Sequence, residues 1–216
     1  RHLDKVLEYP NNKYSEDAML MGAEMAYTAK DYEKALHIYK QLKDKAASME
    51  RRQLAKTGML RSAHMLGNEE EIIFAATDLL ADTKLAPELS NEAHYYRAKA
   101  YLDAGKTDGA MEDLKILAKD TRNVYGAEAK YKVAQIYFDG GQTDKAEQEV
   151  LNYIEVSTPH TYWLARSFVL LADVYMKLGR NLDAKQYLLS LKQNYQADDD
   201  IAGMIESRLE KLKTEN

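Results

Sequence analysis

Apolar residues recur at helical spacing along most of the chain, in paired runs that short turns separate. The clearest pair lies at Tyr131–Val150, YKVAQIYFDGGQTDKAEQEV, where a Gly-Gly turn divides two runs and Ala146 stands near the start of the second. Apolar residues spaced three and four apart form a stripe on one face of a helix. Four other segments repeat the arrangement. The pattern therefore predicts an all-α array of one repeated helix pair.

The repeats align on the residue that ends each first helix. Four of them have glycine there, at separations of 38, 36 and 38 residues, and the first has Lys30. Helices commonly end on a left-handed residue, which glycine adopts without steric cost. Five residues later stands a small or apolar residue that lets the two helices approach closely: Ala35, Ile72, Ala110, Ala146 and Ala184. Four residues before the residue that ends the helix stand Ala26, Ala63, Tyr101, Tyr137 and Tyr175, and the three tyrosines are predicted to pack inward.

A fixed period of this length is typical of a solenoid. The first helices are predicted at Tyr14–Ala29, Arg51–Leu66, Pro87–Ala104, Val124–Asp139 and Pro159–Leu178. The second helices are predicted at Tyr32–Ala47, Glu69–Asp82, Thr107–Lys119, Thr143–Val156 and Leu182–Asn194. We interpret the chain as one array with repeats at 13–48, 49–85, 86–122, 123–157 and 158–196. Residues 1–12 are interpreted as the end of a truncated preceding repeat, and 197–216 as a capping helix.

Local residues support these helix ends. Polar residues after each turn, such as Asp31 and Asn68, can begin or cap the second helix. Pro87 and Pro159 suit the first turn of a helix, and Thr158 is a candidate N-cap. Three aspartates at 198–200 precede a last helix, whose N-terminus favours negative charge. Its single apolar stripe suits the solvent-facing cap that repeat arrays require.

Composition narrows the function classes. The chain has 216 residues, 45% of them hydrophobic, and a net charge of −5 without a basic face, so nucleic acid is not expected as a partner. Its longest apolar runs are far shorter than a membrane span of about 20 residues, so no direct membrane insertion is expected. The five histidines are scattered singly and cysteine is absent. With no metal-ligand spacing, phosphate loop or nucleophile motif, we predict a non-enzymatic protein without metal or cofactor.

The array resembles the tetratricopeptide repeat (TPR) family. The best match is the first repeat, with Ala23, Ala26, the run Asp31-Tyr32-Glu33-Lys34-Ala35, and then Tyr39 and Leu42. The chain departs from the family where Trp is frequent, and has there Met19, Lys56, His94, Lys130 and Phe168. The resemblance implies antiparallel helix pairs wound into a right-handed superhelix, which holds a partner protein in its concave groove.

The residues Tyr9-Pro10-Asn11-Asn12, followed by Ser15 and Ala18, resemble the junction between repeats in bacterial cell-envelope TPR proteins. Members of that group act in outer-membrane protein assembly or beside the Tol–Pal system. The resemblance implies a periplasmic or cell-envelope location, with the cytoplasm as the alternative. Residues 1–8 look like the tail of a helix whose beginning is missing, so we expect a fragment of a longer protein.

The family frame also places residues on the concave face. The candidate partner-binding set is Arg61, His64, Tyr95, Lys99, Tyr131, Lys132, Gln135, Phe138 and Arg166. Aromatic and arginine side chains are frequent binding anchors. The alternative is that Tyr95 and Tyr131 pack on the next repeat, and Trp163 has the same two interpretations. The two-Lys, two-Asn, one-Arg clamp of chaperone-tail binders is not present at the equivalent positions.

The sequence thus favours a protein-interaction scaffold that binds a partner segment. The alternative is a structural spacer or self-association module of a larger cell-envelope protein, with a homodimer formed through the repeat ends. No residue constellation supports an enzyme.

Overall fold

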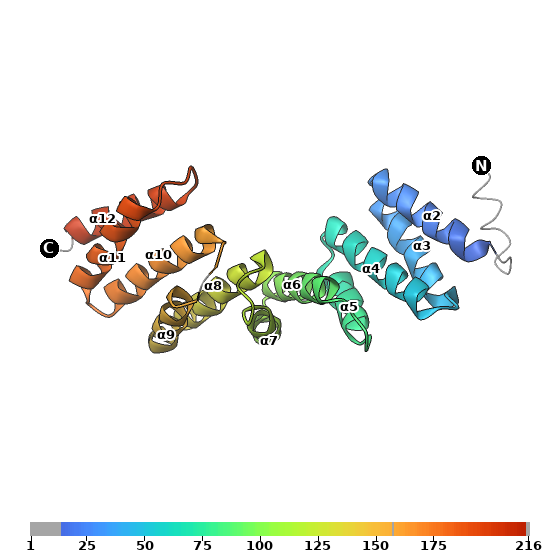
Figure 1. Cartoon of the computed structure of the whole chain (residues 1–216), viewed down its shortest axis with the longest axis horizontal. Coiled ribbons are helices and arrows are strands. Elements are labelled where there is room, and N and C mark those ends of the chain that lie inside the picture. The colour runs from blue at the N-terminus through green and yellow to red at the C-terminus, as the bar shows by residue number, and fades with distance from the viewer. Residues whose placement is uncertain (1–13, 157, 215–216) are drawn as a thin grey trace. The chain divides into compact units, whose positions relative to one another are not determined.

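The computed structural model describes residues 14–156 and 158–214, and this part of the chain forms eleven α-helices and no strand (Figure 1). The first helices of the repeats are α2 (Ser15–Thr28), α4 (Met49–Leu66), α6 (Pro87–Asp103), α8 (Val124–Asp139) and α10 (Thr161–Lys177). The second helices are α3 (Tyr32–Lys45), α5 (Glu69–Leu80), α7 (Thr107–Leu117), α9 (Thr143–Ile154) and α11 (Asn181–Asn194), and α12 (Ile201–Thr214) follows. The all-α prediction is confirmed. The predicted repeat remnant at 1–12 and the Tyr9–Pro10 junction lie outside the described residues.

The chain divides into two compact units within α7, after Ala110. In the first unit each helix packs against the next from α2 to α6, and the first helices α2, α4 and α6 also contact one another in turn. Its core is formed by alanine, leucine and methionine from both kinds of helix. Fully buried members include Ala23, Ala35, Leu42, Met59, Leu60, Ala63, Ala76 and Leu79.

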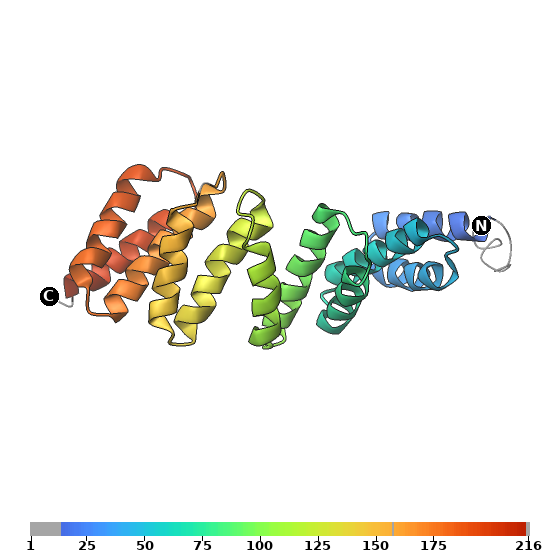
Figure 2. The ribbon, with the colours of Figure 1, turned by 60° about the horizontal axis from the view of Figure 1, so that its bottom comes forward.

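In the second unit, α10 is the central helix, because it packs against α8, α9, α11 and α12. Consecutive helices of this unit run in opposite directions (Figure 2). The core again combines small and branched residues, among them Ala146, Val150, Leu171, Ala172, Val174, Ala184, Leu188, Ile201 and Ile205. Asp199 Oδ1 accepts a hydrogen bond from the backbone N–H of Ile201 at 3.0 Å, which places acidic charge at the start of α12 as predicted.

Each first helix ends in the same hydrogen-bonded turn. In the first repeat, the N–H of Asp31 donates to the carbonyl oxygen of Ala26 and the N–H of Lys30 to that of Tyr27, both at 2.9 Å. These two bonds define a Schellman motif, whose penultimate residue is left-handed. Lys30 has a φ of 63°, and Gly67, Gly105, Gly141 and Gly179 have φ between 64° and 74°. The predicted left-handed position is therefore confirmed in all five repeats, including the one without glycine.

The close approach of paired helices is also confirmed. Ala35, Ala110, Ala146 and Ala184 are 0% exposed and Ile72 is 5% exposed. Of the tyrosines predicted to pack inward, Tyr175 is buried, whereas Tyr101 and Tyr137 are half-buried. Gly58 adds a contact that the repeat frame did not predict, because a Cβ atom there would overlap the ring of Tyr39.

The predicted start of the first helix in the fifth repeat is wrong by two residues. Thr158 does not cap it: the helix begins at Thr161 with His160 in the N-cap position. Thr158 Oγ1 instead accepts from the N–H of His160 at 3.1 Å and donates to the carbonyl oxygen of Thr121 at 2.8 Å. That longer-range bond fixes the loop, so Pro159 precedes the helix. The predicted caps Asp31 and Asn68 are confirmed by side-chain bonds to backbone N–H groups at 3.2 and 3.1 Å.

Candidate interaction surfaces

Arg61 and Glu92 join the first helices α4 and α6 of the first unit. Arg61 Nε and Nη2 donate to Glu92 Oε1 and Oε2, each at 2.8 Å, which is the two-bond geometry that holds a guanidinium and a carboxylate in one orientation. The hydrogen bonds to Glu92 raise the pKa of Arg61 further above its ordinary value, although burial opposes the shift. The predicted contact residue Arg61 is therefore already paired, and the pair fixes the surface between the two helices.

His64 stacks on Tyr96 beside this ion pair. Their ring centroids are 3.9 Å apart and the ring planes differ by 14°. Burial and the positive charge of Lys99 lower the pKa of His64 below its ordinary value of 6.5, although Glu92 acts in the opposite direction. The lowered pKa favours the neutral imidazole, and both rings of the stack are half-buried.

Tyr95 and Lys99 extend the same surface along α6. The Lys99 ammonium nitrogen lies 5.6 Å from the ring centroid of Tyr95, within the range of a cation–π contact. The rings of Tyr95 and Tyr96 are 6.0 Å apart. We call this set the α4–α6 surface, and its members are Arg61, His64, Glu92, Tyr95, Tyr96 and Lys99.

In the second unit, Arg166 lies among aromatic rings. Its Nη1 donates to the hydroxyl of Tyr162 at 2.9 Å and its Nη2 to that of Tyr131 at 3.3 Å. The guanidinium carbon is 5.1 Å from the Tyr131 ring and 6.0 Å from that of Trp163. Arg166 therefore links α8 to α10 by contacts inside the protein.

Tyr131 belongs to this packed cluster. Only 5% of the residue is exposed, and its hydroxyl donates to Gln135 Oε1 at 2.7 Å. Its ring lies 5.7 Å from that of half-buried Trp163. These contacts fit the packing interpretation of both residues, which the sequence left open.

The remaining predicted residues of the second unit are half-buried. Lys132 places its ammonium nitrogen 5.9 Å from the Tyr131 ring. Phe138 lies further along α8, where Lys177 of α10 is 5.0 Å from its ring. The predicted set thus forms two groups, one in each unit, and Phe138 makes none of the contacts around Arg166 described above.

The sequence interpretation missed Glu92 and Tyr96. A signal for them exists in the spacing of opposite charges and aromatic pairs across neighbouring repeats. Arg61 and Glu92 are 31 residues apart, as are Lys40 and Glu71, whose side chains meet at 2.7 Å.

Within the residues that the structure describes, no group of three histidine, aspartate or glutamate side chains could hold a metal ion. No helix in the described part of the chain is both long enough and apolar enough to cross a membrane.

Comparison with known proteins supports the repeat assignment. Residues 92–120 and residues 165–193 each match a model of the tetratricopeptide repeat. No curated protein sequence shows significant similarity to the chain.

Solved structures of similar fold come from proteins of low sequence identity. One is the MamA protein, with a TM-score of 0.65 and 16% identity over 86% of this chain and 98% of MamA. A second is YrrB, described as a TPR protein with an unusual peptide-binding site, with a TM-score of 0.62 and 15% identity over 90% and 94% of the two chains. A third is BtubC from P. vanneervenii, at 0.56 and 12% over 91% and 90%. At these identities the similarity is one of fold.

Proposed function

We propose, from the tetratricopeptide repeats that the chain carries at residues 92–120 and 165–193, that it is a protein-interaction module which binds a segment of a partner protein. Repeat arrays of this kind expose extended surfaces formed by neighbouring repeats, and they use them for binding. We assign the partner segment to the α4–α6 surface of the first unit.

The observation that carries the assignment is the stack of His64 on Tyr96 beside the exposed Lys99. The stack holds two half-buried aromatic rings in one orientation before a partner arrives. The Arg61–Glu92 pair fixes the helices beneath it. Binding to a preorganised surface loses less side-chain entropy than binding to a mobile one.

The chemistry of this surface indicates what the partner presents. An aliphatic or aromatic side chain would pack on the rings of His64 and Tyr96, and a neighbouring carboxylate would pair with Lys99. Arg61 contributes less, since Glu92 already neutralises it. We keep the site in the first unit because Tyr131 and Arg166 of the second unit are occupied by contacts with each other.

The test selects short random peptides displayed on phage against the whole chain, and measures their affinity by fluorescence anisotropy. We expect selected peptides to carry an apolar residue next to an acidic one. Lys99→Glu and His64→Ala should each weaken binding about tenfold, because one reverses the charge and the other removes half of the stack.

Lys34→Glu is the matched control, since Lys34 is an exposed lysine on α3, outside the proposed surface. It should leave peptide affinity unchanged. Circular dichroism confirms that all three variants keep their helices. Peptides that bind both surface variants as tightly as the parent chain would contradict the proposal.

A second candidate function is that of a self-association module within a larger protein. We propose the cell envelope as the location of that protein. Exposed methionines on α2 favour self-association: Met21 and Met25 are 56% and 60% exposed. They line a hollow of about 470 Å³. Static light scattering tests this candidate, because Met21→Gln with Met25→Gln should convert a dimer into a monomer. A parent chain that is already monomeric at high concentration contradicts it.

A further inference from the structure

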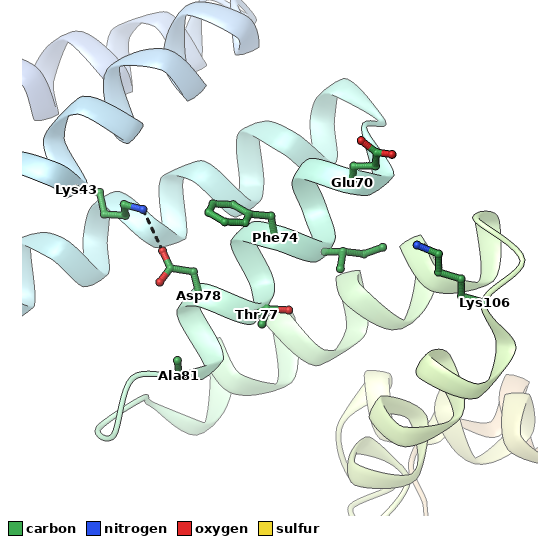
Figure 3. A pocket seen from close by; sticks show the side chains of 8 residues that line it. Lys43, Glu70, Phe74, Thr77, Asp78, Ala81 and Lys106 are labelled. Carbon is green, nitrogen blue, oxygen red and sulfur yellow. Dashed lines mark hydrogen bonds and ion pairs between the residues drawn. The ribbon is translucent and has the colours of Figure 1, made fainter.

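A second surface of the first unit contains a hollow beside an exposed phenylalanine. The hollow has a volume of about 700 Å³ and lies along α5, between Lys43 of α3 and Lys106, which follows α6. Figure 3 shows the Phe74 ring standing out from α5, with Lys43 on one side and Lys106 on the other. None of its lining residues belongs to the α4–α6 surface. We call it the Phe74 pocket.

Phe74 departs from the pattern of its own repeats. It stands seven residues after the left-handed residue Gly67, and the residues at the same position in the other repeats are all polar: His37, Glu112, Gln148 and Gln186. The inner face of α5 is already apolar and buried, with Ile72 and Leu79 at most 5% exposed. Phe74 is 55% exposed, so α5 has a second apolar position on its outer face.

The charges inside the pocket are already paired. Asp78 accepts from Lys43 at 3.3 Å and lies 3.0 Å from the ammonium nitrogen of Lys56. Lys43 also lies 5.6 Å from the centre of the Phe74 ring. Asp82 also accepts from Lys56, at 2.6 Å, so that two carboxylates balance the two lysines on the wall from which Phe74 projects.

Two rim residues of opposite charge remain, Glu70 and Lys106. Both are exposed, and within the described chain neither forms an ion pair. An apolar projection, a hollow next to it, one acid and one base form a set that is complementary to its own copy. In a two-fold dimer each surface contributes the same residues to both sides of the interface.

We propose that the Phe74 pocket binds a second copy of this chain in a two-fold dimer. The Phe74 ring of each copy enters the hollow of the other, and Glu70 of each pairs with Lys106 of the other. This inference is independent of the α4–α6 surface, with which the pocket shares no residue. Dimerisation and partner binding are then compatible, and one dimer has two α4–α6 surfaces for partner segments.

Sedimentation velocity of the whole chain over a range of concentrations tests the dimer. Phe74→Gln gives α5 the residue that two other repeats have at this position, so the variant should fold and should weaken dimerisation about 10–100-fold. Glu70→Lys and Lys106→Glu should each weaken it by at least about tenfold, because each places like charges opposite one another.

Charge exchange makes the test specific. The double variant, Glu70→Lys with Lys106→Glu, should dimerise like the parent chain. An equimolar mixture of the two single variants should also form a dimer, because each copy then offers the charge that the other lacks. Glu33→Lys is the matched control, since Glu33 has the position of Glu70 in the first repeat and lies outside the pocket; it should change nothing.

Three outcomes would overturn the proposal. The first is a parent chain that is monomeric at all concentrations. The second is a dimer that survives Phe74→Gln and is lost with Met21→Gln and Met25→Gln, which assigns the interface to α2. The third is a mixture of the two single charge variants that stays monomeric. Each can be told apart from a failure of the α4–α6 surface, which is measured by peptide binding and not by mass.

Discussion

The ammonium group of Lys56, on α4, donates to Asp82 Oδ1 at 2.6 Å and to the backbone carbonyl oxygen of Asp78 at 2.8 Å, although only 7% of the residue is exposed. Lys56 occupies the position at which tetratricopeptide repeats frequently have Trp. Its methylene stem lies in the core while its charge reaches the second helix of the same repeat. Lys130 repeats the arrangement with Glu149, at 2.8 Å. In these two repeats the lysine at this position forms an ion pair with a carboxylate of the same repeat.

Replacing Lys56 tests how much this bond stabilises the first unit. We expect Lys56→Met to lower the free energy of unfolding by about 1–3 kcal/mol, because it leaves Asp82 without its charged partner in a partly buried site. Urea denaturation followed by circular dichroism measures the change. Lys130→Met removes a single carboxylate contact and should cost less. Equal stability of the Lys56 variant and the parent would contradict the prediction.

The ion pair between Lys56 and the Asp78 carboxylate, 3.0 Å apart, predicts a pH dependence. Burial opposes the charge on Asp78, but hydrogen bonds from Lys56 and Lys43 lower its pKa below the ordinary 3.8. A lowered pKa contributes stability that is present above the unfolded value and is lost as pH falls through the folded one. Burial likewise opposes the charge on Lys56, yet its carboxylate partners raise its pKa above 10.5, so that contribution is lost at high pH. The difference in unfolding free energy between parent and Lys56→Met should be constant at neutral pH and shrink below about pH 4. Denaturation at a series of pH values measures it, and a difference that grows on acidification would contradict the assignment.

Lys30 is strained in a way that the other four repeats are not. Its φ of 63° lies in the left-handed region, where a residue with a Cβ atom costs about 1–2 kcal/mol relative to the right-handed one. Lys30→Gly should therefore raise the melting temperature of the first unit, and Gly141→Ala, at a φ of 74°, should lower that of the second. Thermal unfolding measures both. The prediction fails if the two substitutions shift the transition in the same direction.

The close helix contacts predict a cost for larger side chains. Ala146 and Ala184 are 0% exposed at the start of α9 and α11. Ala146→Leu and Ala184→Leu should each cost about 1–3 kcal/mol by forcing the paired helices apart. Ala202→Leu on α12 is the control, because Ala202 is exposed, and it should leave stability nearly unchanged. If the two buried variants keep the unfolding free energy of the parent chain, these helices can move apart without cost.

The features that the sequence predicted correctly depend on residues within one repeat. Apolar spacing defines each helix, and the left-handed residue that ends it is set by the backbone of the same turn, so even Lys30 could be placed in the frame. Helix starts that depend on a distant partner were predicted less well. Thr158 is the example, since its hydroxyl bonds to Thr121, 37 residues earlier, instead of capping a helix.

The exposure of the candidate site residues could not be predicted in the same way. Whether Tyr131 faces a partner or the core depends on Arg166, which comes 35 residues later and covers its ring. Phe74 is a partial exception. Its departure from the polar pattern is visible in the aligned repeats, but the hollow beside it is also lined by Lys43 of α3 and by Lys106 after α6, which no pattern within one repeat predicts.

The burial of Tyr131 and the position of Tyr95 predict different results for the same substitution. Tyr131→Ala should destabilise the second unit by about 3–5 kcal/mol, because it removes a buried ring that packs on Trp163 and Arg166. Tyr131→Phe keeps the ring and loses only the hydroxyl bond to Gln135, so it should cost about 0.5–1.5 kcal/mol. Tyr95→Ala, at a half-buried position on α6, should cost less than Tyr131→Ala and should weaken peptide binding. Urea denaturation and the peptide assay separate the two roles. If Tyr131→Ala keeps the parent's stability and loses peptide affinity, Tyr131 is a contact residue after all, and its assignment to the packed cluster is wrong.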